Sequence, residues 1–572
     1  MTFLGRSGTF ERNTSSDLGY ERRSVGWVRL SGVFVCAAFM VGAGASAAAG
    51  AGNGPARAAG AKGDGRDPVP VEPSIVEVQQ AFAAKRFDVR ALERHYETRI
   101  AIVDRAGPAI NSVIELNPDA ARIAGELDVA GNAGGLAVAA GSAQKRPLYG
   151  VPILLKDNID TGDRMQTTAG SLALVGSKPP RDAFIVRKLR DAGALILGKT
   201  NLSEWANFRS TRSTSGWSGR GGQTRNPYAL NRNPCGSSSG SGAAIAADLA
   251  VVAVGTETDG SVVCPSSVNG LVGIKPTVGL VSRSGIIPIS ASQDTAGPMA
   301  RSVADAAALL NVLAGYDPDD PATEPLKSRA PVDYTQFLNR DGLRGVRIGV
   351  MRKDAGFHDE VEALFNHTIE TLRSMGAIIV DPADIPTRGK FDNDEQTVLL
   401  YEFKDGLNRY LAGRGATPRT LADLIAFNNT ERDREMPIFA QELFVNAQAK
   451  GPLTDKEYVE ARERSKRLAG VEGIDAALAK DHLDVLIAPT LGAAWTTDWV
   501  NGDHFLGGNV SSPPAVAGYP HVTVPMGLVR GLPVGLSFVG TAWSEGKLIT
   551  YAYAFEQGTH ARRPPHFTAN VP

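Results

Sequence analysis

The sequence predicts an α/β fold in which a β-sheet is covered by helices on both faces. Short apolar runs that are typical of buried strands end at polar residues, as in "YGVPILLKDNID" and "ALILGKTN". Segments with helical periodicity and helix-capping residues lie between these runs. Because strands that alternate with helices place those helices on the faces of a sheet, we expect the sheet to be buried.

The charge and the histidine spacing limit the partners and cofactors that we expect for this protein. The 572 residues carry 60 Lys and Arg against 61 Asp and Glu, which gives a net charge of −1. The two signs are interspersed, so electrostatics gives no reason to expect nucleic acid as a partner. None of the eight histidines shows metal-ligand spacing, and we expect neither a metal nor another cofactor. The sequence does not fix an oligomeric state.

The first 47 residues have the pattern of a secretory signal peptide. Arg22, Arg23 and Arg29 precede the apolar run "LSGVFVCAAFMVGA", and "ASA" at residues 45–47 supplies the small residues of a cleavage site. An uncleaved anchor is the alternative, although glycine, alanine and serine in the later half weaken a spanning helix. We therefore expect a periplasmic or secreted protein with no stable membrane association after cleavage.

The predicted domain follows a linker. Residues 48–70 are rich in glycine and alanine without periodicity, which is typical of a flexible linker. We place the folded domain at residues 71–570. Its first segment, "SIVEVQQAFAAKRFDVRALERHYETRIAIVDRAG", predicts two amphipathic helices with a break near Phe87 and Asp88.

Strands with polar ends come next. "YGVPILLKDNID" predicts a buried strand that ends at Lys156, and "ALILGKTN" repeats the pattern with Lys199. A lysine after an apolar run is ordinarily an exposed strand end, and we expect this of Lys199. "GVRIGVM" and "LDVLIAPT" predict further strands.

Helix signals lie between and after these strands. Ser302 with Asp305 resembles a capping box that opens a helix, and Gly315 marks its end. Residues 331–474 are richer in charge and in helical pattern, and we expect this section to form a helical cap over the site.

Two cysteines of the predicted domain stand near the polar motifs. Cys36 falls in the predicted signal peptide, which leaves Cys235 and Cys264. We expect these two to be free, buried thiols, and the sequence alone leaves their pairing open.

Four stretches, taken in order, resemble the amidase signature family. They are "LLKDN", "CGSSSGSG", "TETDGSVVCPSSVNGLVGIKPT" and "AGYPHVTVPMGLVRGLPVGLSFVGTAWSEGKLITYAYAFEQ", and the resemblance runs from about Ser74 to Pro565. It implies a single large domain with a central mixed, twisted β-sheet. It also implies a Ser-cisSer-Lys triad, with Ser261 as nucleophile, Lys156 as base and Ser237 between them after a cis peptide bond.

The residue chemistry fits these implied roles. A serine hydroxyl is a poor nucleophile until a base removes its proton. A free lysine has a pKa near 10.4, so Lys156 serves as a base only if burial lowers that pKa. Ser237 would then relay a proton between Ser261 and Lys156. Such a site hydrolyses a carboxamide to a carboxylate and ammonia through an acyl-enzyme.

The residues before the nucleophile form the implied oxyanion hole. The resemblance assigns it to the backbone amides of Thr258, Asp259, Gly260 and Ser261. The commoner family pattern has two glycines where this chain has Asp259 and Gly260, and the role of Asp259 stays open. "TETDGS" with "GLVSRSGIIPIS" resembles the peptide amidase branch, which removes the C-terminal amide of peptides. Arg283 of the second stretch is a substrate contact or a salt-bridge partner.

Three other functions remain open. Residues 236–240 fit G-x-S-x-G, so an α/β-hydrolase esterase could use Ser238 with Asp484 and His521. An amidotransferase A-type subunit would share the whole pattern but work in the cytoplasm with companion proteins. A secreted binding protein that has lost catalysis is the third, and the intact Lys156, Ser237 and Ser261 argue against it.

Overall fold

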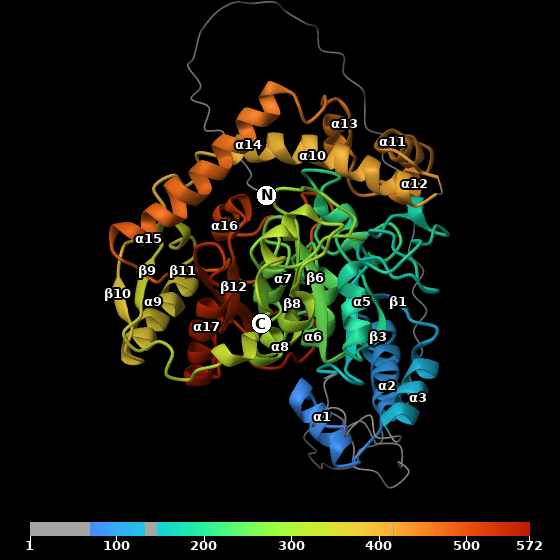
Figure 1. Ribbon diagram of the computed structural model, residues 1–572, viewed down its shortest axis with the longest axis horizontal. Coiled ribbons are helices and arrows are strands. Elements are labelled where there is room, and N and C mark those ends of the chain that lie inside the picture. The colour runs from blue at the N-terminus through green and yellow to red at the C-terminus, as the bar shows by residue number, and fades with distance from the viewer. Residues whose placement is uncertain (1–68, 132–145, 416, 572) are drawn as a thin grey trace, which may run out of the picture. The chain divides into compact units, whose positions relative to one another are not determined.

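A mixed sheet of eleven strands forms the centre of the computed structural model, which describes residues 69–131, 146–415 and 417–571 (Figure 1). The strand order is β1-β3-β2-β6-β8-β7-β12-β13-β11-β9-β10. Pairs β3–β2, β2–β6, β11–β9 and β9–β10 are parallel, and the others are antiparallel. The predicted α/β architecture with a mixed central sheet is confirmed. The predicted signal peptide lies outside the described residues, as does nearly all of the linker.

Most strands are short, and the two longest ones form a hairpin near the C-terminus. Their bounds are β1 Val113–Leu116, β2 Pro152–Lys156, β3 Leu195–Thr200, β4 Trp217–Ser218, β5 Gly222–Gln223, β6 Val252–Glu257, β7 Val272–Lys275, β8 Thr295–Ala300, β9 Arg347–Val350, β10 Ile378–Val380, β11 Val485–Pro489, β12 His521–Val529 and β13 Leu532–Val539. Strands β4 and β5 form a separate two-stranded ribbon.

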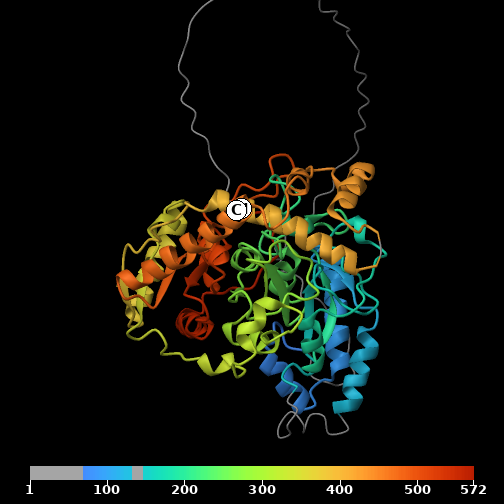
Figure 2. The same ribbon diagram turned by 45° about the horizontal axis from the view of Figure 1, so that its top comes forward.

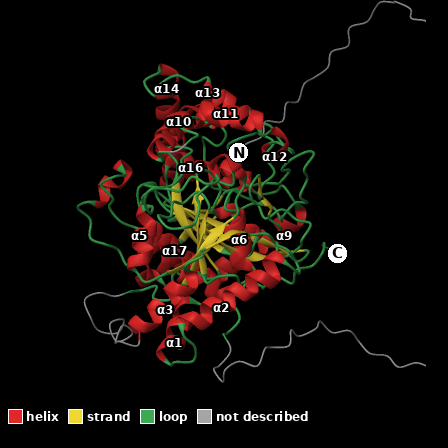
Figure 3. Cartoon of the chain, turned by 90° about the vertical axis from the view of Figure 1, so that its right-hand side faces the viewer, coloured by secondary structure: helices red, strands yellow, loops and turns green. Residues whose placement is uncertain are grey.

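Helices cover both sides of the strands (Figure 3). Helix α6 packs on β2, β3 and β6, and α17 packs on β12 and β13. The helices are α1 Ile75–Ala83, α2 Val89–Arg99, α3 Ala120–Ala130, α5 Phe184–Asp191, α6 Ser239–Ala246, α7 Val263–Val268, α8 Val303–Leu313, α9 Asp359–Ser374, α10 Asp392–Gly413, α11 Leu421–Thr430, α12 Arg432–Glu435, α13 Glu442–Gln448, α14 Lys456–Ala469, α15 Ala476–Lys480, α16 Ser512–Ala517 and α17 Glu545–Thr559.

Local sequence explains where several helices begin. Ser74 caps α1 in a capping box with Glu77, and Asp88 caps α2 by accepting from the Ala91 amide. Ser302 accepts from the amide of Asp305 at the start of α8. The predicted helix pair with its break at residues 87–88 is thereby confirmed, as is the capped helix after Ser302.

Helices α10 to α14 lie together on one side of the domain, and Figure 2 brings them forward. The buried apolar residues of α14 belong to two other hydrophobic clusters. Apolar residues of α10, α11 and α13 form a cluster that is separate from the large core around the sheet. That cluster joins Phe403 and Leu407 of α10 to Trp205, Ile287 and Ile289. Residues 331–474 also contribute β9 and β10 to the sheet edge, so this section is not entirely helical. In the described part of the chain no helix is long and apolar enough to cross a membrane.

The prediction of free thiols was wrong. Cys235 and Cys264 form a disulfide, with their Cα atoms 6.0 Å apart. The spacing of the two cysteines carries no information on this point, because the fold brings together segments 29 residues apart.

Candidate active site

Lys156 ends the buried strand β2 and is itself fully buried. Its Nζ lies 2.7 Å from Ser237 Oγ, and it donates to the hydroxyl and the carbonyl of Thr256 at 2.9 and 3.1 Å. Burial lowers the pKa of Lys156 to about 7, although the carboxylates of Glu257 and Asp294 oppose part of this shift. A large fraction of this amine is therefore neutral near pH 7.

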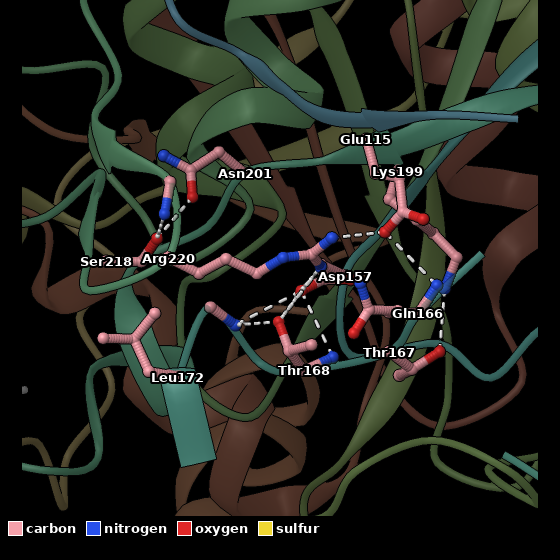
Figure 4. A network of polar contacts seen from close by, with 12 residues as sticks. Glu115, Asp157, Gln166, Thr167, Thr168, Leu172, Lys199, Asn201, Ser218 and Arg220 are labelled. Carbon is pink, nitrogen blue, oxygen red and sulfur yellow. Dashed lines mark hydrogen bonds and ion pairs between the residues drawn. The ribbon is translucent and has the colours of Figure 1, made fainter. Parts of the chain in front are cut away.

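Lys199 is also fully buried, so its predicted exposure was wrong. Its Nζ donates to the Ile159 carbonyl at 2.6 Å. It also donates to Thr167 Oγ1 at 2.9 Å, as Figure 4 shows. Burial lowers the pKa of Lys199, and the carboxylates of Asp157 and Asp160 act against that shift. Leu155 of β2 pairs with Lys199, which places Lys156 and Lys199 on opposite faces of the sheet.

A network of charged side chains near Lys199 holds the segment that follows Lys156. Asp157 is fully buried and accepts from the amide of Thr168 at 3.2 Å. Arg220 bridges Asp157 and Glu115, as Figure 4 shows. These charges are paired with one another, so we assign this network to the scaffold that fixes the end of β2.

Ser237 lies on the loop that leads into α6. The peptide bond between Gly236 and Ser237 is cis, as the resemblance implied. Ser238 ties this loop to strand β6, because its hydroxyl donates to the Thr256 carbonyl at 3.1 Å and accepts from the Thr256 amide at 3.2 Å. A Cβ on Gly255 would lie 2.7 Å from Ser238 Oγ, so only glycine allows this close approach.

Ser261 lies in the turn between β6 and α7 and is 8% exposed. Its carbonyl accepts from the amide of Ser238 at 3.2 Å, which joins the turn to the Ser237 loop. Glu257 accepts from the amides of Val262 and Val263 at 2.7 and 3.1 Å, and so fixes the start of α7. Gly260 has a φ of +76°, a conformation that favours glycine.

The structure also gives Asp259 a position. Its carboxylate accepts from Ser511 Oγ at 2.5 Å and from Ser512 Oγ at 2.7 Å. Asp259 therefore links the turn of the predicted oxyanion hole to the start of α16.

A cavity of about 790 Å³ opens onto Ser237 and Thr258. One wall is the segment Gly285 to Ala291, which presents the side chains of Ile286, Ile287 and Ile289. Arg283 lines the cavity but pairs with Asp320 at 2.6 Å, which is the salt bridge considered from the sequence. Pockets of this size and mixed lining bind small molecules or short peptides.

Helix α10 holds that wall through Glu402, which the sequence did not single out. The Glu402 carboxylate accepts from Ser290 Oγ at 2.5 Å, from the amide and hydroxyl of Ser292 at 2.9 and 2.6 Å, and from Tyr458 Oη at 2.6 Å. Asp294 continues the connection, because it accepts from the Ser290 amide at 2.9 Å and from Thr258 Oγ1 at 2.6 Å. Burial raises the pKa of Asp294 to about 6.

We expect Glu402→Gln to raise KM more than it changes kcat. The single amide oxygen replaces only one of the two carboxylate oxygens, so two of the four donors lose their carboxylate acceptor and the wall at residues 290–292 loosens. An increase in KM of about three- to tenfold with kcat within about twofold is expected from the loss of one or two hydrogen bonds. Glu463→Gln, at an exposed position of α14, is the matched control and should leave both constants unchanged. A fall in kcat alone would contradict the assignment of Glu402 to the wall.

The structure does not bring together the residues of the esterase alternative. His521 is buried on β12, where its Nε2 lies 2.6 Å from Ser537 Oγ, and burial and Lys275 lower its pKa to about 3. Asp484 accepts from the amide of Arg347. The Ser238 hydroxyl makes its hydrogen bonds to the backbone of Thr256. Ser238, Asp484 and His521 therefore each bond to other residues and not to one another.

Known proteins resemble this chain over most of its length. The family model named Amidase matches residues 95–549. Native peptide amidase from Stenotrophomonas maltophilia, a solved structure, is 55% identical with a TM-score of 0.81, over 86% of this chain and 98% of that one. A probable amidase of Arabidopsis thaliana is 42% identical over 507 residues, 87% of this chain and 92% of the relative. The A-type subunit of glutamyl-tRNA(Gln) amidotransferase from Acinetobacter baumannii is 34% identical over 506 residues, 86% of this chain and 97% of the relative.

Proposed function

Because this chain belongs to the amidase signature family and is an amidase, we propose that it hydrolyses the C-terminal amide of peptides, or a related small amide, through a serine acyl-enzyme. Lys156, Ser237 and Ser261 carry the reaction. The observation that best supports this is a fully buried lysine with a pKa lowered to about 7, whose Nζ lies 2.7 Å from Ser237 Oγ. The similarity to peptide amidase favours the peptide amide as substrate.

The hydrogen bonds of Lys156 fit the role of a neutral base. A neutral amine has two N–H donors and one lone pair. The two donors are satisfied by the hydroxyl and the carbonyl of Thr256, so the lone pair is left for the hydroxyl proton of Ser237. Asn158 donates to the same Thr256 hydroxyl at 2.9 Å and holds it in place.

The reaction then follows in two halves. Ser261 attacks the amide carbon while its proton passes through Ser237 to Lys156. Backbone amides of the turn at residues 258–261 stabilise the oxyanion, and the relay returns the proton to the departing ammonia. Water attacks the acyl-enzyme with the same relay as base, and the carboxylate leaves with Ser261 restored.

The test is ammonia release from a matched set of substrates. Peptide C-terminal amides, the same peptides as free acids, and simple aliphatic and aryl amides are incubated with the purified chain. We expect ammonia from the peptide amides and no cleavage of the free acids. Cleavage of internal peptide bonds, or ammonia from simple amides alone, would reject the peptide amide as substrate.

The pH dependence of kcat follows from the same lysine. The proton on Lys156 must be absent and Asp294 must be ionised, and both conditions are met as pH rises through about 7 and about 6. We expect kcat at pH 6 to be about one twentieth of its plateau above pH 8, since one pH unit below its pKa Lys156 is about one tenth neutral, and Asp294 is about half ionised at its own pKa. Initial rates between pH 5 and 9 measure this. A rate that rises toward acid pH would exclude a lysine base.

An amidotransferase component is the second candidate, and 34% identity to the A-type subunit of glutamyl-tRNA(Gln) amidotransferase favours it. That activity transfers ammonia with companion proteins. Ammonia release by the isolated chain from peptide amides, with no added partner, separates the two candidates in favour of the hydrolase.

We further propose export with removal of residues 1–47. The basic and apolar pattern of that segment supports it, and so does the Cys235–Cys264 disulfide, because disulfides persist in oxidising compartments. Cell fractionation followed by N-terminal sequencing tests the proposal. A chain that starts at Met1 in the soluble cytoplasmic fraction would reject it.

A further inference from the structure

The disulfide joins the two loops that carry the serines of the candidate site. Cys235 stands directly before Gly236 and Ser237, and Cys264 is three residues after Ser261. A single covalent bond thus connects the loop of the relay residue to the helix that follows the nucleophile. Neither the family roles nor the mechanism above uses this bond.

Hydrogen bonds from two asparagines link the same two segments. Asn269 Nδ2 donates to the carbonyl of Pro234 at 3.0 Å and to that of Pro265 at 2.7 Å. Asn226 Nδ2 donates to the carbonyls of Asn233 and Val268 at 3.3 and 3.0 Å. The segments are therefore tied together by four contacts to two asparagines, and these contacts do not need the disulfide.

The backbone at Cys235 needs such support. Its φ is +55°, a left-handed conformation that is uncommon for a residue with a side chain. Residues in this region persist when surrounding contacts hold them. The Cys235 amide donates to Asn233 Oδ1 at 2.8 Å, and the disulfide holds the side chain from the other direction.

The disulfide lies among apolar side chains, and one of its two cysteines is partly exposed to solvent. Cys235 is buried, and the pair packs against Val268, Leu491, Trp495 and Phe505. Cys264 is partly exposed, so we expect a small reductant to approach the bond from the Cys264 side.

We propose that the Cys235–Cys264 disulfide is a positioning element that sets the separation of Ser237 and Ser261, so that the rate of acylation depends on its oxidised state. The inference rests on the proposed function. Reduction by a dithiol proceeds through a mixed disulfide. It converts the Cys235–Cys264 bond to two thiols, while the reagent is oxidised to its cyclic disulfide, with two electrons and two protons transferred. The asparagine contacts keep the segments folded, but the Ser237 loop gains freedom relative to Ser261.

The test compares oxidised, reduced and reoxidised protein in a Cys36→Ser background, so that every thiol counted comes from this pair. After dithiothreitol treatment, two thiols per chain should be titrated. We expect kcat for a peptide amide to fall about ten- to a hundredfold, since misplacement by about 1 Å is enough for such losses. KM should change by less than about twofold, because the cavity wall at residues 285–291 does not include either cysteine.

A fluorophosphonate probe measures the nucleophile without a substrate, and its labelling rate should fall by the same factor as kcat. Reoxidation should restore both. The double variant Cys235→Ser/Cys264→Ser should match the reduced protein and ignore dithiothreitol. Circular dichroism of each sample gives the folded fraction, and Ile369→Val in the core of α9 controls for a modest loss of stability alone.

Two results would overturn the inference. One is full release of both thiols with kcat and labelling rate unchanged. The other is a loss of activity that only follows the unfolded fraction, as in the Ile369→Val control, since that is a structural role without positioning. If the oxidised protein neither releases ammonia nor reacts with the probe, the proposed function fails first, and the inference falls with it.

Discussion

Ser261→Ala is expected to reduce kcat for amide hydrolysis by about 10⁴-fold or more, because no other group then forms the acyl-enzyme. The folded structure should persist, since the Ser261 contact to the neighbouring loop is made by its carbonyl and not by its side chain. Ammonia release from a peptide amide measures the loss, and labelling by a fluorophosphonate probe should disappear with it.

Ser266→Ala is the matched control for this variant. Ser266 is fully buried on the adjacent helix α7, and its hydroxyl has no hydrogen-bond partner among the described residues. Removing that hydroxyl is the same chemical change at a buried position five residues away, and kcat should stay within about twofold because no hydrogen bond is lost. Ser261→Ala with wild-type turnover would end the assignment of the nucleophile.

Lys156→Met is expected to reduce kcat by about 10³- to 10⁴-fold, the upper part of the range for loss of a general base. Methionine has a similar length and no charge, so the buried end of β2 keeps its shape. The part of the rise of kcat between pH 6 and 8 that comes from Lys156 should vanish with the amine, which leaves only the about twofold rise from Asp294. Initial rates across that range, with circular dichroism to confirm folding, provide the measurement.

Lys199→Met separates this effect from the general cost of losing a buried lysine. Lys199 is as buried as Lys156 and makes two hydrogen bonds, but it lies on the opposite face of the sheet. We expect a lower Tm, with kcat of the folded protein within about threefold and the pH profile retained. An equal loss of kcat in both variants would mean that Lys156 acts through packing rather than as a base.

The sequence was sufficient for the elements that depend on local pattern. The strand that ends at Lys156 and the helices capped at Ser74 and Ser302 follow from neighbouring residues, which is why they agree with the structure. The proposed roles of Ser237 and Ser261 came from resemblance to a family, because a serine in a glycine-rich loop does not by itself indicate catalysis.

The features that the sequence missed depend on contacts between distant segments. Lys199 is buried because Ile159 and Thr167 supply acceptors from another loop. Glu402 looks like an ordinary charge on a helix, and its partner Ser292 is 110 residues away. The disulfide is of the same kind, since only the fold places Cys235 beside Cys264. No local pattern reports such proximity.

Apolar residues of α10, α11 and α13 share one hydrophobic cluster with Ile287 and Ile289 of the cavity wall, and this cluster is separate from the core around the sheet. The proposed proton relay includes Lys156 at the end of the central strand β2. The cavity wall, which we propose to contact the acyl group, packs on these helices at Ile287 and Ile289. Substitutions at Phe403 or Leu407 are therefore expected to change the shape of the cavity wall at residues 285–291 without moving Lys156, Ser237 or Ser261. Evolution toward a new amide substrate can therefore act on the side chains of α10, α11 and α13 while the proposed catalytic residues are kept.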